Sequence, residues 1–141
     1  IIKLLKQQYG DCYLIPEGGT NALAIRGCEE IVAEIDTDFD YLCCPVGTGG
    51  TVAGLISGLK GKSNVIGFSS LKGNFLQKEV GQLLEEEGSH FTNWIINTDY
   101  HFGGYAKTKP ALLDFIKGFE EQHHIPLFNP LLTKCQNGFV F

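Results

Sequence analysis

Apolar positions along the chain follow two different periods, and segments of the two kinds alternate. Short apolar runs indicate strands, whereas longer segments with apolar residues three or four positions apart indicate amphipathic helices. Because strands and helices alternate, we predict an α/β fold with a parallel sheet and helices on both faces. The strands are expected over 12–16, 41–44, 65–68 and 93–97, and the helices over 1–9, 22–35, 50–59, 74–87 and 110–122.

Residues with special backbone properties mark several of these boundaries. Asn21 is suited to cap the helix over 22–35, and Gly88 follows the helix over 74–87. Pro110 stands at a first helical turn, where its missing N–H group costs nothing. Pro45 follows an apolar run and is expected to end that strand.

Composition limits the class of protein. The chain has 141 residues, about one domain, and is 43% hydrophobic, which is enough for a core. Its net charge of −5 argues against nucleic-acid binding, and no apolar run has the length of a membrane span. Five cysteines without metal-ligand spacing indicate a cytoplasmic protein with reduced thiols and no metal site. The chain lacks methionine, so we expect it to be a piece of a longer protein.

The sequence GTGGT, residues 47–51, is the strongest candidate for chemistry. It follows a predicted strand and directly precedes a predicted helix. Bare glycines allow backbone N–H groups to approach an anion, and the helix N-terminus adds partial positive charge. Thr48 and Thr51 can add hydroxyl donors. The pattern therefore predicts a phosphate-binding loop.

Phosphate loops of three kinds, and a structural alternative without a ligand, are possible for this segment. A Walker loop requires a lysine before the last Ser or Thr, and Gly50 stands at that position. A dinucleotide-binding GxGxxG motif requires a third glycine, which Val52 replaces. A cup for the phosphate of pyridoxal 5′-phosphate remains. The structural alternative is a tight turn with no ligand.

Three segments together resemble one enzyme family. They are GTGGT, the segment IPEGGTNA over 15–22, and Tyr105 within HFGGYAKTKPALLDFI. The chain resembles the 1-aminocyclopropane-1-carboxylate deaminase / D-cysteine desulfhydrase family of fold-type II pyridoxal-phosphate enzymes. The resemblance implies that residues 1–141 form part of the larger, tryptophan synthase β-like cofactor domain. The part of that domain with the Schiff-base lysine is expected to be absent.

The resemblance also implies roles for individual residues. Tyr105 would be catalytic and face the substrate, and Thr133 would contact the pyridine nitrogen of the cofactor. Two alternatives stay open, because Asn21 can act only as a helix cap and Tyr105 can be an ordinary half-buried side chain. The cofactor phosphate would be held by Gly47, Thr48, Gly49, Gly50 and Thr51, and the substrate pocket would include Gly18, Gly19, Thr20 and Asn21.

The tail over 131–141 departs from the family pattern. Leu132 stands where the family has a tyrosine, and the small residue before Lys134 is missing. A shift of reading frame near Thr133 is one hypothesis for the difference. Thr133 itself favours the desulfhydrase-like members, because the deaminase proper has a glutamate at that position.

The activity implied is that of a pyridoxal-phosphate-dependent lyase or deaminase acting on a small amino acid. D-cysteine would give a 2-oxo acid, ammonia and sulfide; the alternatives are 1-aminocyclopropane-1-carboxylate deaminase activity and a non-catalytic module that binds a phosphate-bearing ligand. The family's Asn-Lys and Ser-Asn-His motifs do not occur in the chain. We therefore expect this chain alone to be inactive, and the full-length protein to be a homodimer.

Overall fold

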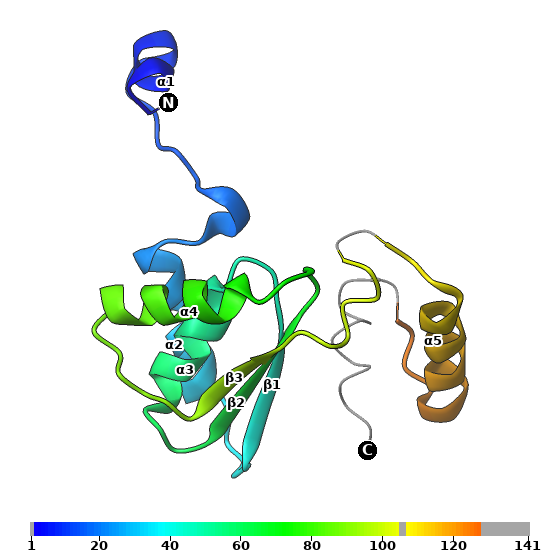
Figure 1. Cartoon of the computed structure of the whole chain (residues 1–141). Helices are drawn as coiled ribbons and strands as arrows, with labels where there is room; N and C mark the ends of the chain where they lie inside the picture. The colour runs from blue at the N-terminus through cyan, green and yellow to red at the C-terminus, as the bar shows by residue number, and fades with distance from the viewer. Residues whose placement is uncertain (1, 105–106, 128–141) are drawn as a thin grey trace.

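The computed structural model describes residues 2–104 and 107–127 (Figure 1). All five predicted helices and three of the four predicted strands are present, within two residues of their predicted bounds. The elements in chain order are α1 (Ile2–Tyr9), the 3₁₀ helix η1 (Glu17–Gly19), α2 (Ala22–Ala33), β1 (Tyr41–Val46), α3 (Gly50–Leu59), β2 (Asn64–Ser69), α4 (Phe75–Glu86), β3 (Trp94–Asn97) and α5 (Pro110–His123).

The strands form one parallel sheet with β2 between β1 and β3. Val46 at the end of β1 is aligned with Ser69 of β2, and Phe68 of β2 is aligned with Asn97 of β3. Helices α3 and α4 connect successive strands, as parallel pairing requires. The carboxyl ends of all three strands therefore meet at one edge, which confirms the predicted βαβ arrangement.

The main hydrophobic core lies between the sheet and α3 with α4. Helix α2 packs on α3 at close range, because glycines face it: a methyl group at Gly54 would overlap the Cys28 side chain and the Ile25 carbonyl oxygen. The core cluster consists of Ile25, Cys44, Val46, Val52, Ala53, Leu55, Ile56, Leu59, Val65, Leu76, Val80 and Leu84.

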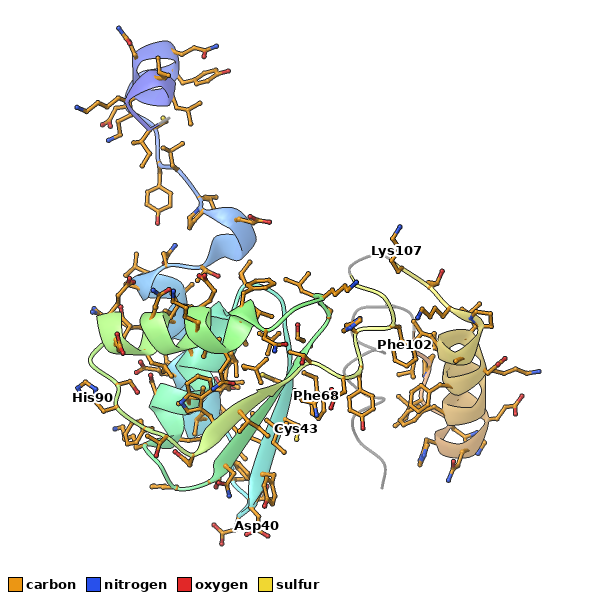
Figure 2. All side chains as sticks on the ribbon, in the orientation of Figure 1. Asp40, Cys43, Phe68, His90, Phe102 and Lys107 are labelled. Atoms are coloured by element: carbon orange, nitrogen blue, oxygen red, sulfur yellow. The ribbon has the colours of Figure 1, made fainter. Side chains whose placement is uncertain are left out.

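The opposite side of the sheet is covered differently. Figure 1 shows α2, α3 and α4 on one side and α5 on the other, so helices lie on both sides as predicted. Figure 2 shows Phe68 and Cys43 on the side toward α5. Phe68 is buried and makes an edge-on ring contact with Tyr100 at 6.0 Å, whereas Tyr41 is 61% exposed. The described residues therefore cover the second side of the sheet only in part.

The predicted strand over 12–16 is wrong. This segment has no regular structure and leads into η1, and its Tyr13 and Ile15 side chains are 73% and 76% exposed. A strand requires a neighbour for its backbone hydrogen bonds and a surface for its side chains. An apolar run alone supplies neither, and no strand within the described part of the chain pairs with it.

Pro45 does not end β1, which continues to Val46. Within residues 2–104 and 107–127, β1 pairs with β2 alone and is therefore an edge strand of the described sheet. Proline is tolerated on an edge strand because its missing N–H group can face away from the neighbour. Strand β1 thus reaches the glycine loop directly.

Helix α1 stands apart from the sheet (Figure 1), and its Ile2 and Leu4 side chains are more than 60% exposed. In residues 2–104 and 107–127, no helix combines the length and the hydropathy needed to cross a lipid bilayer.

Candidate functional site

The glycine loop lies at the carboxyl edge of the sheet. β1 ends at Val46 and α3 begins at Gly50, so Gly47, Thr48 and Gly49 form the whole connection. In open α/β sheets, ligands bind beyond the carboxyl ends of the strands. The loop therefore lies where this type of fold binds its ligands.

Helix α3 presents free amide groups to the loop. Its N-cap residue is Gly49, and no side chain caps the helix. The first hydrogen bond of the helix runs from the Ala53 N–H group to the Gly49 carbonyl oxygen, at 3.0 Å. The preceding N–H groups have no acceptor in the helix, and the helix dipole makes this end partly positive. The N-terminus of α3 can therefore hold an anion such as phosphate.

Gly49 is required by the protein's own structure. Its φ angle is +94°, in the left-handed region that favours glycine. A methyl group at this position would lie 2.9 Å from Cγ2 of Val80 on α4. Conformation and packing both exclude a larger residue, with or without a ligand.

Gly47 differs from Gly49 in both respects. Its φ angle lies outside the left-handed region, and a methyl group would meet no protein atom within 4 Å. The fold itself therefore does not require glycine at position 47. A bare backbone facing open space is expected where a ligand approaches the main chain closely, and this favours a ligand loop over a simple tight turn.

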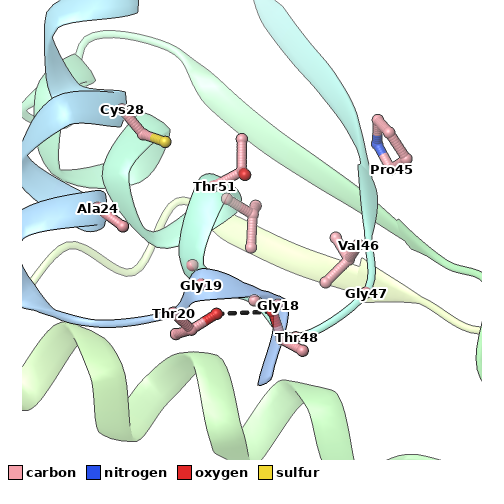
Figure 3. Close-up of a pocket in the computed structure, with 13 residues that line it drawn as sticks. Gly18, Gly19, Thr20, Ala24, Cys28, Pro45, Val46, Gly47, Thr48 and Thr51 are labelled. Atoms are coloured by element: carbon pink, nitrogen blue, oxygen red, sulfur yellow. Dashed lines mark hydrogen bonds between the residues drawn. The ribbon is translucent and has the colours of Figure 1, made fainter. Parts of the chain in front are cut away.

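The segment containing η1 lies against the loop. Gly18 has a φ angle of +65°, and a methyl group there would overlap the Thr48 side chain. The Thr20 and Thr48 hydroxyl groups form a hydrogen bond of 2.6 Å, drawn in Figure 3. A methyl group at Gly50 would lie 2.9 Å from Oγ1 of Thr20. The two segments, 28 residues apart in sequence, thus form one site.

Two cavities adjoin this site. The smaller one, of about 250 Å³, lies beside the N-terminus of α3 (Figure 3). The larger one, of about 550 Å³, extends over the ends of β1 and β2. Gly47 and Thr48 line both cavities. The smaller cavity is also lined by Gly18, Gly19, Thr20, Ala24, Cys28, Gly49, Gly50, Thr51 and Val52, and the larger one by Glu17, Gly18, Ser70 and Leu71.

Of the predicted substrate residues, Gly18, Gly19 and Thr20 line the smaller cavity and Asn21 does not. The Thr20 hydroxyl is paired with Thr48. Asn21 caps α2, because its Oδ1 atom accepts a hydrogen bond from the Ala24 N–H group at 2.9 Å. Asn21 thus caps α2, as the sequence predicts, and substrate contact by these residues stays a prediction.

Sequence reasoning missed Ser70, which the parallel register brings beside the glycine loop. Its N–H group donates to the carbonyl oxygen of Val46 at 3.4 Å, and the residue lines the larger cavity. A signal was present, because a polar residue directly after a predicted strand is expected at the same sheet edge. The predicted residues Tyr105 and Thr133 lie outside the described residues.

Comparison with known proteins identifies the family. The sequence profile of a family described as "Pyridoxal-phosphate dependent enzyme" matches residues 1–113 of this chain. The match includes the η1 segment, the glycine loop and all three strands.

Two individual proteins are similar to parts of this chain. A protein of Thermotoga maritima named "Putative 1-aminocyclopropane-1-carboxylate deaminase" is 40% identical over 63 residues, which cover 40% of this chain and 20% of that protein. A solved structure described as an "ACC deaminase homologue" superposes with a TM-score of 0.78 at 24% identity. The superposition covers 96% of this chain and 46% of the solved chain, so this chain spans less than half of that protein.

Proposed function

This chain belongs to the pyridoxal-phosphate dependent enzymes, and from that premise we propose that its glycine loop holds the phosphate group of pyridoxal 5′-phosphate. The observation that supports the loop's role is the open space at Gly47 beside the uncapped N-terminus of α3. The donor set fits a phosphate, because backbone amides and threonine hydroxyls are phosphate ligands. Residues 47–51 would supply these contacts.

The residues around the loop would bind and orient the cofactor. The amides at the start of α3 would hold the phosphate, and the Thr20–Thr48 hydrogen bond would fix the Thr48 side chain beside it. When bound, pyridoxal phosphate supplies an electron sink for bond breaking at an amino-acid α-carbon. By the family resemblance, Thr133 would contact the pyridine nitrogen and Tyr105 would face the substrate.

We propose a deaminase acting on a small amino acid, with 1-aminocyclopropane-1-carboxylate as the first candidate substrate. The names of the two similar proteins support this choice. D-cysteine is the second candidate, because Thr133 matches the desulfhydrase-like members of the family. The 141-residue chain alone is expected to be inactive, because it lacks the family's Asn-Lys motif.

The two substrates can be distinguished in one assay on the full protein that contains this chain. Both candidates release ammonia and a 2-oxo acid, and only D-cysteine releases sulfide. Ammonia and 2-oxo acid from 1-aminocyclopropane-1-carboxylate, without sulfide from D-cysteine, are expected. Sulfide release from D-cysteine alone would reverse the assignment. Cofactor binding without turnover of either compound would favour the non-catalytic module.

We further propose that the full protein is a homodimer that works in the cytoplasm without nucleic-acid or membrane partners. The cytoplasmic location is supported by the free thiols of Cys12, Cys28, Cys43 and Cys44. Analytical ultracentrifugation of the full protein tests the dimer, and a sedimentation coefficient typical of a monomer at micromolar concentration would contradict it.

A further inference from the structure

Ser70 and its neighbour Ser69 are both buried at the end of β2, but their hydroxyl groups are used differently. Ser69 Oγ donates to the Leu71 carbonyl oxygen at 2.9 Å and accepts from the Leu71 N–H group at 3.0 Å. Ser70 is 5% exposed, and its hydroxyl has no hydrogen-bond partner within residues 2–104 and 107–127. Ser70 Oγ is not among the fully enclosed side-chain atoms that lack a partner in the described part of the chain, so the hydroxyl still faces open space, and the origin of that space requires an explanation.

The explanation lies in the larger cavity, which Ser70 lines. Three residues with polar side chains line that cavity. Glu17 is exposed, Thr48 is paired with Thr20, and Ser70 is buried with an unused hydroxyl. A cavity of about 550 Å³ has the size of a small-molecule site. Ser70 is therefore the buried polar group that a ligand in this cavity would meet.

One phosphate-bearing ligand would occupy the two adjoining cavities together. The smaller cavity adjoins Gly49, Gly50 and Thr51 at the start of α3, which suits the phosphate. The larger cavity shares Gly47 and Thr48 with the smaller one but does not include the residues of α3. A ligand with its phosphate in the smaller cavity would therefore extend past Gly47 and Thr48 toward Ser70.

We propose that the Ser70 hydroxyl is a binding group for the pyridoxal portion of the cofactor, separate from the phosphate cup. This inference rests on the proposed function. The position of Ser70 is maintained by the backbone, because its N–H group donates to the Val46 carbonyl oxygen at the base of the glycine loop. The hydroxyl can donate or accept one hydrogen bond with a polar substituent of the ring.

The test compares two ligands on the full protein after removal of bound cofactor. Pyridoxine 5′-phosphate has a ring and a phosphate but no aldehyde, so it reports binding without a covalent bond. Inorganic phosphate reports the cup alone. In Ser70→Ala, the dissociation constant of pyridoxine 5′-phosphate is expected to rise about threefold to tenfold, the range for loss of one hydrogen bond. The dissociation constant of inorganic phosphate is expected to stay unchanged.

Ser57→Ala is the matched control. Ser57 Oγ is a buried atom without a partner in the described part of the chain, and Ser57 lines neither cavity. This variant is expected to bind both ligands as the wild type does. Ser70→Cys keeps nearly the same volume with a weaker donor, and should weaken pyridoxine 5′-phosphate binding even if the alanine variant fails to fold.

Each outcome separates the two proposals. If the wild type binds neither ligand, the proposed function is wrong and the role of Ser70 falls with it. If the wild type binds both and the Ser70 variants bind pyridoxine 5′-phosphate equally well, only the role of Ser70 is wrong. If the Ser70 variants bind both ligands more weakly by the same factor, Ser70 contacts the phosphate, and the inference is overturned.

Discussion

Replacement of Gly47 or Gly49 by alanine tests whether the loop exists for a ligand or only for a turn. The two glycines are two residues apart, and the same methyl group is added in each variant. At Gly49 it enters a left-handed backbone and approaches Val80 on α4, whereas at Gly47 it enters open space. We therefore expect Gly49→Ala to impair folding, and Gly47→Ala to impair ligand binding alone.

The expected magnitudes differ clearly. A left-handed conformation costs a non-glycine residue about 1–2 kcal/mol, and overpacking against Val80 adds about 1–3 kcal/mol. Gly49→Ala should thus lower the free energy of unfolding by about 2–5 kcal/mol. Gly47→Ala should leave it unchanged or raise it by up to about 1 kcal/mol, because alanine restricts the unfolded chain. A methyl group in the ligand space should weaken phosphate binding about tenfold or more.

The assay combines urea unfolding with binding of inorganic phosphate to the full protein. Gly88→Ala is a useful control, because its φ angle is +71° and a methyl group would meet nothing within 4 Å. It isolates the conformational cost at about 1–2 kcal/mol. The difference between the Gly49 and Gly88 variants then measures the Val80 contact.

Two results would refute the reasoning. Phosphate binding of wild-type strength in Gly47→Ala would show that the ligand does not approach this backbone, and the phosphate cup would be wrong. A loss of stability in Gly47→Ala as large as in Gly49→Ala would show that the fold itself requires both glycines, as a tight turn would.

Three further predictions concern other parts of the fold. Gly54→Ala should destabilise the protein by at least about 2 kcal/mol by separating α2 from α3, whereas Gly81→Ala, with nothing within 4 Å, should stabilise it by about 0.5–1 kcal/mol; urea unfolding measures both. Asn21→Ala should lose about 1 kcal/mol in the same measurement, because the Ala24 N–H group loses its acceptor. Burial raises the pKa of the Cys43 thiol above its ordinary value of 9.0, so the folded state keeps this proton to higher pH than the unfolded state. The contribution of the Cys43 thiol to the free energy of unfolding is complete below about pH 9 and declines as the pH rises through the folded pKa. This decline in stability should be absent in Cys43→Ala.

The sequence alone determined the alternation of helices with parallel strands and the position of the glycine loop. These features depend on local causes: the spacing of apolar residues along each segment and the left-handed backbone that glycine permits at Gly49. Helix α3, for example, has the predicted bounds, because small and apolar residues continue without a break from Gly50 to Leu59.

Only the tertiary structure decided which apolar segment pairs and which loop residues meet. Residues 12–16 have strand-like composition but no strand beside them in the described part of the chain, and Pro45 is accepted within β1 because that strand lies at an edge of the described sheet. The approach of Ser70 to the Gly47 loop depends on the parallel register of β1 and β2. The Thr20–Thr48 hydrogen bond depends on the η1 segment packing against the glycine loop. Such contacts join positions far apart in the chain, so local periodicity carries no signal for them.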